Sequence, residues 1–406
     1  MISVDEAKKI IEQHVKSVET EEVQLLSAHG RVLAADIVAR EDIPQADNSS
    51  MDGFALRASD TSGAADGSPI ALSVVHEVAA GQVLNRALVP QTTVRIMTGA
   101  TIPQGADAVI EQEAVSSNNG SVVLQKPVSP GRNIRRKGED IKSGNTALPK
   151  GTMLRAAHLG VLASLGISMV RVAKKPSAAF LTTGNELVGV DERLSPGKIR
   201  NSNALTLSGL LAESGCVPVS LGVASDREDD LDAKIDEGLA YDVLITSGGV
   251  SVGKYDLVLN VMQKKGVDIK FWKVNLKPGM PCAFGTRSKQ DGSQVLVFCL
   301  PGNPVSTMVT FLQFVRPALF QMMGKMNESP EKFHATLEHD IRKEDSKRHF
   351  SRGIVQNVNG KLLVRTTGTQ SSGALTSLVR ANCLVIIPEE ARLLRAGDAV
   401  EIELLH

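Results

Sequence analysis

Short apolar runs alternate with longer stretches of helical period through the middle of the chain. The runs are rich in β-branched residues and predict strands at residues 178–183, 217–223, 242–246, 269–274 and 295–300. Apolar residues recur at helical spacing at residues 203–214, 227–240, 256–265 and 304–323. Strands that alternate with helices are typical of βαβ units. We therefore expect an α/β domain with a mostly parallel sheet that is covered by helices on both faces.

The pattern changes on both sides of this region. From about residue 39 to 150, short alternating runs are separated by Gly, Pro and Asn, at residues 71–78, 93–97, 108–112 and 121–126. Similar strand signals follow residue 327, at residues 334–338, 353–358, 362–366 and 383–387. These patterns predict a β-rich insertion and a small, barrel-like C-terminal module.

The insertion interrupts a further small unit. Residues 23–33 and 152–166 have the pattern of two parts of one connecting domain, and a chain of 406 residues has room for two to four domains. We therefore expect four domains. The α/β domain comprises residues 1–20 and 172–326, the connecting domain 21–38 and 146–171, the β-rich insertion 39–145 and the C-terminal all-β domain 327–406.

Composition and charge narrow the classes of function. Hydrophobic residues make up 42% and charged residues 22% of the chain, as in ordinary globular proteins. The 45 basic residues balance the 45 acidic ones, so no global field attracts the protein to nucleic acid or to an anionic membrane. Aromatic residues are only 3%, too few for a platform that stacks single-stranded bases. Any site for an anion must therefore be local.

Cysteine usage and the N-terminal residues indicate a cytoplasmic protein. The four cysteines have no CxxC spacing and are too few for a disulfide framework, so we expect reduced thiols, mostly in the core. Residues 1–13 mix acids and lysines with apolar residues, unlike a signal peptide. The sequence contains no apolar run of about 18 residues, so we expect no spanning helix.

A Gly-rich segment follows the predicted strand 242–246. Residues 248–254 fit the pattern GxxxxGK, but Tyr255 stands where a phosphate-binding loop of a nucleotide hydrolase needs Ser or Thr for Mg²⁺. Gly-rich backbone at a helix N-terminus still directs N–H groups at an anion, which makes Ser247, Gly248, Gly249 and Ser251 candidate ligand-binding residues. Asp256 either holds a metal near a bound phosphate or caps the helix, and the local pattern does not choose between these roles.

Other polar groups also follow predicted strands, where ligands of parallel sheets bind. Glu186 comes after Thr-Thr-Gly-Asn. Asp226 precedes a predicted helix, and the simpler role for Asp226 is that of the helix N-cap. Lys273 lies near the end of a strand, and a rigid turn that includes Lys277 and Pro278 can present an ammonium to an anion. The fourth group is Pro301-Gly302-Asn303-Pro304, which turn formation alone explains.

The insertion carries further candidates. Asp52 lies in a densely polar stretch, Thr98 follows a strand, and Arg135 and Asp140 belong to a segment of three arginines and two acids that suits a phosphate or pterin ligand. Taken singly, each segment is explained by an exposed loop. The histidines do not have metal-site spacing, and no Ser-His-Asp or Cys-His arrangement is indicated.

Seven segments in this order resemble the molybdopterin molybdenumtransferase family, which includes the C-terminal domain of gephyrin. They are DNSSMDGFAL, RIMTGATIPQGADAVIEQE, NIRRKGEDI, TTGNEL, SGGVSVGKYD, FWKVNLKPGMP and LPGNPVS. The resemblance implies a homodimer of elongated four-domain subunits, one domain being similar to molybdopterin adenylyltransferases. It implies sites shared between subunits and an adenylyltransferase as the upstream partner. The balanced charge argues for no nucleic-acid or membrane partner.

The resemblance also implies a reaction. Molybdate is inserted into adenylylated molybdopterin, and Mg²⁺-dependent cleavage releases AMP. Catalytic acids carry over onto this sequence at Asp52, Asp140, Glu186, Asp226 and Asp256, of which Glu186 and Asp256 are the expected Mg²⁺ ligands. Substrate-binding residues carry over at Thr98, Arg135, Ser247, Gly248, Gly249, Ser251, Lys273, Lys277, Pro278, Pro301, Gly302, Asn303, Pro304, Arg352 and Ser372.

Two positions depart from the commonest family pattern. Asn185 replaces an Asp, which removes a metal-binding charge beside Glu186, and Met280 replaces a Lys, which removes a cation near the anion site. Two other functions stay open. One is another transferase that handles nucleotides or phosphate through the same Gly-rich strand ends, and the other is a non-catalytic scaffold, against which the retained acids argue.

Overall fold

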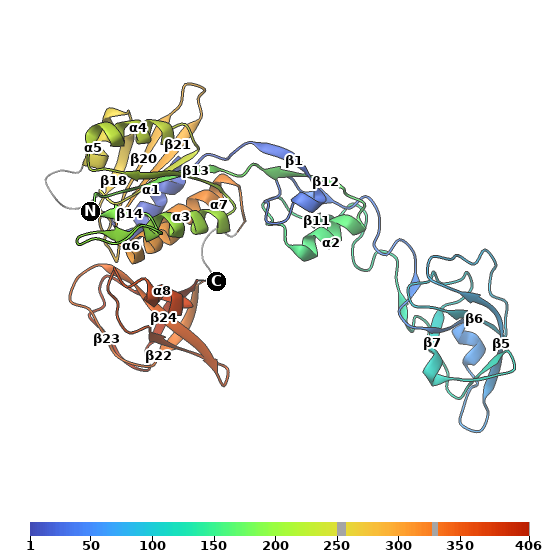
Figure 1. Cartoon of the computed structure of the whole chain (residues 1–406). Coiled ribbons are helices and arrows are strands. Elements are labelled where there is room, and N and C mark those ends of the chain that lie inside the picture. The colour runs from blue at the N-terminus through green and yellow to red at the C-terminus, as the bar shows by residue number, and fades with distance from the viewer. Residues whose placement is uncertain (250–256, 327–331, 406) are drawn as a thin grey trace.

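A computed structural model describes residues 1–249, 257–326 and 332–405. The chain forms an extended arrangement, with an α/β unit and a β-barrel at one end, a narrow connecting unit in the middle and a β-rich unit at the other end (Figure 1). Residues far apart in the sequence therefore contribute to each end. In the described part of the chain, no helix is long and apolar enough to cross a membrane.

The α/β unit contains a six-stranded mixed sheet. Its order is β16 (Val217–Ala224), β13 (Ser177–Thr183), β17 (Val243–Ser247), β21 (Gln294–Leu300), β20 (Ala283–Ser288) and β18 (Asp268–Trp272). The first four strands are parallel, and β20 runs antiparallel to both of its neighbours. The five predicted strands are confirmed, whereas β20 was not predicted. The sheet is mostly parallel, as expected.

Helices cover both faces of this sheet because its side chains alternate between two cores. Ala178 and Phe180 of β13 join one hydrophobic cluster, and Ala179 and Leu181 join the other. The first cluster includes residues of α1 (Val4–His14), α3 (Ser202–Glu213), α6 (Pro304–Thr310) and α7 (Arg316–Met322). The second includes residues of α4 (Glu228–Gly238) and α5 (Leu257–Lys264). The predicted long helix at 304–323 is divided by a π-helical turn, Phe311–Val315.

The β-rich unit has its own six-stranded sheet. The order is β7 (Ala108–Glu111), β4 (Gly53–Leu56), β6 (Thr92–Ile96), β5 (Ile70–Val78), β9 (Ser121–Leu124) and β8 (Ser116–Asn118). A separate two-stranded ribbon is formed by β3 (Asn48–Ser49) and β10 (Ile134–Arg135), which precede and follow the strands of this sheet in the sequence. The four predicted strands of this region are present. The sequence pattern missed the short strand β4, although all four of its residues are buried.

Paired strands and one helix form the connecting unit. β1 (Thr20–Gln24) pairs with β12 (Met169–Ala173), β2 (Ile37–Val38) pairs with β11 (Thr146–Leu148), and α2 (Ala156–Ser164) packs nearby. The pair of β1 and β12 extends across the expected boundaries at residues 20 and 171. The sequence pattern did not detect this pairing, which joins residues about 150 positions apart.

The C-terminal residues form a closed β-barrel. Its strands run in the order β24 (Arg348–Val358), β25 (Lys361–Thr366), β22 (Lys332–Leu337), β28 (Ala399–Leu404) and β26 (Cys383–Ile387), and β26 pairs back to β24. The short strand β19 (Leu276–Lys277) of the α/β unit pairs in parallel with β24. The barrel is therefore attached to the α/β unit through the backbone of the predicted lysine turn. All four cysteines are buried, as expected.

Candidate functional site

A pocket of about 430 Å³ lies at the carboxyl ends of the parallel strands β13, β17 and β21. Topology places it there, because parallel strands end at one edge of the sheet and the loops that follow them meet. The lining includes nine of the predicted site residues, namely Glu186, Asp226, Ser247, Gly248, Gly249, Pro301, Gly302, Asn303 and Pro304, the last of which begins α6. We refer to it as the strand-end pocket.

One buried amide connects the loops of the strand-end pocket. Asn203, in the first turn of α3, donates from Nδ2 to the carbonyl of Gly302 (2.7 Å), to Oγ of Ser247 (2.9 Å) and to Oγ1 of Thr307 (3.2 Å). Both hydroxyls also donate to the Pro301 carbonyl. Asn203 thus fixes the turn 301–304 against the end of β17. The sequence patterns did not identify this role, because nothing local distinguishes Asn203 from a surface amide.

Two glycines are required by the backbone geometry of the strand-end pocket. Gly248 has φ +102°, and a Cβ there would lie 2.7 Å from the carbonyl oxygen of Thr183. Gly184 has φ +144°, and a Cβ there would lie 2.5 Å from Oε2 of Glu186. The missing side chain at position 184 therefore leaves space in which the Glu186 carboxylate folds back toward the sheet.

Asp226 binds a neighbouring loop and does not cap α4. Its backbone N–H donates to Oδ1 of Asn185 (3.2 Å), and its carboxylate accepts from the Asn185 N–H at 3.4 Å. The helix N-cap is Arg227, whose side chain makes no capping hydrogen bond. The simpler N-cap role for Asp226 is therefore wrong. Asn185, the departure from the family pattern, joins the loops that carry Glu186 and Asp226 through its amide.

The predicted cationic residues lie outside the lining of the strand-end pocket, and Lys277 connects the α/β unit to the barrel. Lys277, Pro278 and Lys273 do not contribute to the described lining of that pocket. The Lys273 ammonium lies 3.9 Å from the ring centroid of Trp272, and Lys277 forms an ion pair with Asp345 of the barrel at 3.1 Å. The carbonyl of Ser372 accepts from the N–H of Val305, which follows Pro304 in α6. The start of α6 therefore contacts both the strand-end pocket and the barrel.

Arg352 is a guanidinium buried in the barrel. It is 1% exposed, and it donates to Oγ of Ser377 and to the carbonyl of Ser371, each at 3.1 Å. These partners are uncharged, and burial lowers the pKa of Arg352 to about 10. The hydrogen bond to Ser371 places Arg352 next to the loop that carries Ser372. A buried cation beside a serine loop is a chemically suitable environment for an oxyanion.

The predicted residues of the insertion form a separate group. Asp52 accepts hydrogen bonds from the N–H and Oγ1 of Thr98, at 2.7 and 2.8 Å. These bonds, the backbone bond first, lower the pKa of Asp52. Arg135 lies on β10 opposite Asn48, and the N–H of Asp140 donates to the Ile43 carbonyl. Within one chain the β-rich unit, which carries Asp52 and Thr98, lies at the opposite end of the molecule from the α/β unit that holds the strand-end pocket (Figure 1).

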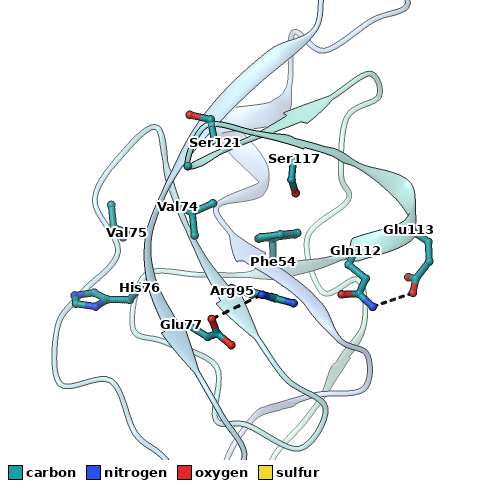
Figure 2. A pocket seen from close by; sticks show the side chains of 11 residues that line it. Phe54, Val74, Val75, His76, Glu77, Arg95, Gln112, Glu113, Ser117 and Ser121 are labelled. Atoms are coloured by element: carbon teal, nitrogen blue, oxygen red, sulfur yellow. Dashed lines mark hydrogen bonds and ion pairs between the residues drawn. The ribbon is translucent and has the colours of Figure 1, made fainter.

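A second pocket, of about 680 Å³, lies on the sheet of the insertion (Figure 2). Phe54 and Arg95, which pair across β4 and β6, contribute to its lining. Arg95 also approaches Glu77 at 3.8 Å, as the dashed line in Figure 2 shows. Since Asp52 immediately precedes β4 and Thr98 follows β6, this pocket adjoins the Asp52–Thr98 pair. The sequence patterns did not predict it.

Two predicted residues, Ser251 and Asp256, lie outside the described residues, so the choice between a metal-binding and a capping role for Asp256 stays a prediction. Among the residues that the structure describes, three or more His, Cys, Asp or Glu side chains do not come together as a metal site. Glu186 and Asp226 are the carboxylates that line the strand-end pocket.

The sequence matches three family profiles along its length. They describe a MoeA N-terminal region (domain I and II) at residues 2–166, a probable molybdopterin binding domain at residues 179–321, and a MoeA C-terminal region (domain IV) at residues 334–405. The second and third matches correspond to the α/β unit and the barrel, and the first spans α1, most of the connecting unit and the β-rich unit. They define the chain as a multidomain molybdopterin-related biosynthesis protein.

Individual relatives are similar to this chain along its full length. The chain is 38% identical to the molybdopterin molybdenumtransferase of Haemophilus influenzae, over 99% of this chain and 98% of the relative. The corresponding Bacillus subtilis protein is also 38% identical, over 100% and 94%. The crystal structure of a molybdopterin biosynthesis moeA protein from Pyrococcus horikoshii OT3 aligns over all of both chains, with 34% identity and a TM-score of 0.84. The chain belongs to the molybdopterin molybdenumtransferase family and is a transferase of molybdenum cofactor biosynthesis, so the resemblance stated from the sequence is confirmed.

Proposed function

We propose that the chain inserts molybdate into adenylylated molybdopterin and releases AMP. The observation that carries the proposal is the junction at the start of α6. Pro304 lines the strand-end pocket, while the next residue, Val305, bonds the loop of Ser372 beside the buried Arg352. A phosphate-bearing substrate in the pocket would therefore have its reacting end close to a site for an oxyanion. Such proximity lowers the barrier to transfer between the two.

The residues on the two sides of this junction would have different roles. In the strand-end pocket, Gly248 allows close approach of the backbone to phosphate oxygens, and Asn203 holds the turn 301–304 in place. On the barrel side, Arg352 and Lys277 would neutralise molybdate, which is a dianion. The chemistry then depends on position and charge stabilisation.

The carboxylates of the strand-end pocket fit a divalent cation. Glu186 and Asp226 both line it and present oxygen donors, and Mg²⁺ in proteins commonly binds through one or two carboxylates together with substrate phosphates. The family resemblance adds Asp256 to this set. Bound Mg²⁺ would supply charge neutralisation as the phosphoanhydride breaks. The chain's own part is to hold the carboxylates, which it does by folding Glu186 over Gly184 and by linking Asp226 to Asn185.

The proposal further includes a homodimer with shared sites. The β-rich unit that carries Asp52 and Thr98 and the α/β unit that carries Glu186 lie at opposite ends of one chain (Figure 1). A two-fold dimer would repeat any contact between the insertion of one subunit and the pocket of the other. Ile199, an apolar residue that lines the pocket, is 55% exposed and could contact such a partner. An adenylyltransferase that makes the adenylylated substrate would act upstream, in the cytoplasm.

The function is tested by incubating the protein with adenylylated molybdopterin, MgCl₂ and molybdate and measuring AMP. We expect AMP release to require both the divalent cation and molybdate. Equal release in excess chelator would contradict the metal role, and equal release without molybdate would contradict the insertion reaction. Absence of any AMP release from a folded protein would instead favour the scaffold function.

The shared site is tested by subunit complementation. Asp52→Asn and Glu186→Gln homodimers should each be nearly inactive. A purified heterodimer of the two variants would carry both defects in one site and none in the other, so it should recover about half of the parental activity. Recovery no greater than that of the mixed homodimers would mean that the two acids do not meet in a site shared between subunits.

A further inference from the structure

The predicted anion-binding lysine already has a partner. Nζ of Lys277 lies 3.1 Å from Oδ2 of Asp345, a barrel residue 68 positions later in the chain. Asp345 lies outside the motifs that carry the family resemblance and outside the predicted site residues. The Lys277 side chain is 57% exposed and that of Asp345 28%, so an anion from solvent can reach the ammonium while it is paired.

The barrel fixes the carboxylate of Asp345 in a definite orientation. Oδ1 accepts from Nε2 of His349 at 2.7 Å and from the N–H of Lys347 at 3.2 Å. These two bonds occupy one oxygen and leave the other directed at Lys277. Arg392 donates to the backbone carbonyl of Asp345, which further restrains the residue.

The loop that carries Asp345 is itself held rigidly. Lys343 is 4% exposed, and its ammonium donates to the carbonyls of Lys347, Pro388 and Glu389. On the side of the α/β unit, Asn275 donates to the Ser346 carbonyl at 2.8 Å, and its own carbonyl accepts from the Arg348 N–H at 3.0 Å. These bonds join the segment of Lys277 to the loop of Asp345. The ion pair therefore lies within a fixed junction and is more than a chance surface contact.

We infer that Asp345 is a built-in counter-ion of Lys277, which an incoming oxyanion must displace or share. Asp345 is thus a positioning residue that sets how tightly the oxyanion is held. The inference rests on the proposed function, in which Lys277 binds molybdate. Lys277 can change partners because its ammonium lies on a flexible four-carbon chain, whereas the carboxylate cannot follow it.

A counter-ion has a chemical advantage in a transferase. Binding that is equally strong in the ground state and the transition state lowers the substrate concentration needed but does not speed the chemical step. An ammonium without a competitor would hold free molybdate, or another dianion, more tightly than transfer requires. The negative charge of Asp345 near the anion weakens this ground-state binding.

The test uses the purified full-length protein and sodium molybdate, both in titration calorimetry and in the AMP-release assay. Asp345→Asn should lower the half-saturating molybdate concentration about 3- to 10-fold, as expected when one charge several Å from a dianion is removed in a partly solvated setting. The rate at saturation should stay within about twofold of the parent, because ground-state binding alone has changed. A second neutral variant, Asp345→Ser, should behave alike, and Asp345→Glu should stay close to the parent. A variant with impaired folding would not bind more tightly, so the direction of the change distinguishes this role from a structural one.

Two controls define the origin of the effect. Glu401 forms a comparable ion pair with Lys332 at 2.8 Å elsewhere on the barrel, with side chains 33% and 49% exposed, and Glu401→Gln should leave the molybdate dependence unchanged. In a Lys277→Ala background, Asp345→Asn should have a much smaller effect, because the two residues are coupled.

The inference and the proposed function fail in different ways. If Lys277→Ala weakens molybdate binding but Asp345→Asn leaves it unchanged or weakens it, the counter-ion role is overturned and the function stands. If the parental protein shows no dependence on molybdate at all, both are overturned.

Discussion

The role of Asn203 in the strand-end pocket leads to a quantitative prediction for Asn203→Leu. Leucine has nearly the same shape as asparagine but cannot donate, so the substitution removes the hydrogen bonds with little change in packing. Ser247 and Thr307 keep their bonds to the Pro301 carbonyl, whereas the carbonyl of Gly302 loses its 2.7 Å partner. An unsatisfied buried carbonyl costs about 1–3 kcal/mol. Part of this cost is offset, because Oδ1 of Asn203 is buried without a hydrogen-bond partner in the described part of the chain.

We therefore expect Asn203→Leu to lower the free energy of unfolding by about 1–2 kcal/mol, which corresponds to a decrease in melting temperature of roughly 2–8 °C. Trp272, the chain's single tryptophan, lies on β18 of the same sheet, and its fluorescence can follow urea unfolding of this unit. The turn 301–304 should also lose its fixed position. Since small misplacements at a site can cost about 100-fold in rate, we expect kcat/KM for AMP release to fall about 10-fold or more.

Asn382 of the barrel provides the matched control. Its amide accepts from the Val355 N–H at 2.8 Å and donates to the Val355 carbonyl at 2.9 Å, away from the strand-end pocket. Asn382→Leu should lower stability but leave kcat/KM for AMP release near that of the parent. If Asn203→Leu leaves both the unfolding midpoint and kcat/KM unchanged, the amide does not hold the turn, and the reasoning is refuted.

Three other substitutions test separate parts of the structure. Glu186→Gln should reduce AMP release about 100-fold, as for other preorganised charge-stabilising groups, with a melting temperature close to the parent's. The control is Glu192→Gln, an exposed acid in the same connection between β13 and α3, and equal activities of the two variants would return Glu186 to a solvated role. Gly248→Ala should lower both the melting temperature and AMP release, because the alanine Cβ would lie 2.7 Å from the Thr183 carbonyl oxygen at a φ of +102°. A melting temperature and an activity equal to those of the parent would show that the loop relaxes freely. Burial raises the pKa of Asp345, but the hydrogen bonds from His349, the Lys347 N–H and Lys277 outweigh burial and lower the pKa below its usual value of 3.8. The stability that the charged carboxylate contributes is therefore complete above pH 3.8 and is lost as the pH falls through the lowered pKa. Urea unfolding from about pH 5 to about pH 3 should therefore show a smaller loss of stability for Asp345→Asn than for the parent, and identical losses would contradict the ion pair.

Local patterns were sufficient for most of the secondary structure. β17 and β13 are buried on both faces of a parallel sheet, and such strands appear as continuous apolar runs that sequence analysis can identify. The loops rich in Gly and Pro after them were also recognised as site loops, because ligands bind at the carboxyl ends of parallel strands. The strands β4 and β20 were missed. β4 is only four residues long, and β20 has Gly285 at its centre, so neither has a long apolar or alternating run.

The sequence patterns and motifs also identified the residue types of the site, but not their contacts. It was the tertiary structure that decided that Asn203 meets Gly302, that Lys277 meets Asp345, and that Asp226 bonds Asn185 and does not cap its helix. Each of these contacts joins residues about 40 to 100 positions apart, at the junction of separate strands and loops. Helical and strand periodicities describe only which face of one element is buried. Which residues meet across elements depends on strand order, register and the packing of whole units, and no single segment contains that information.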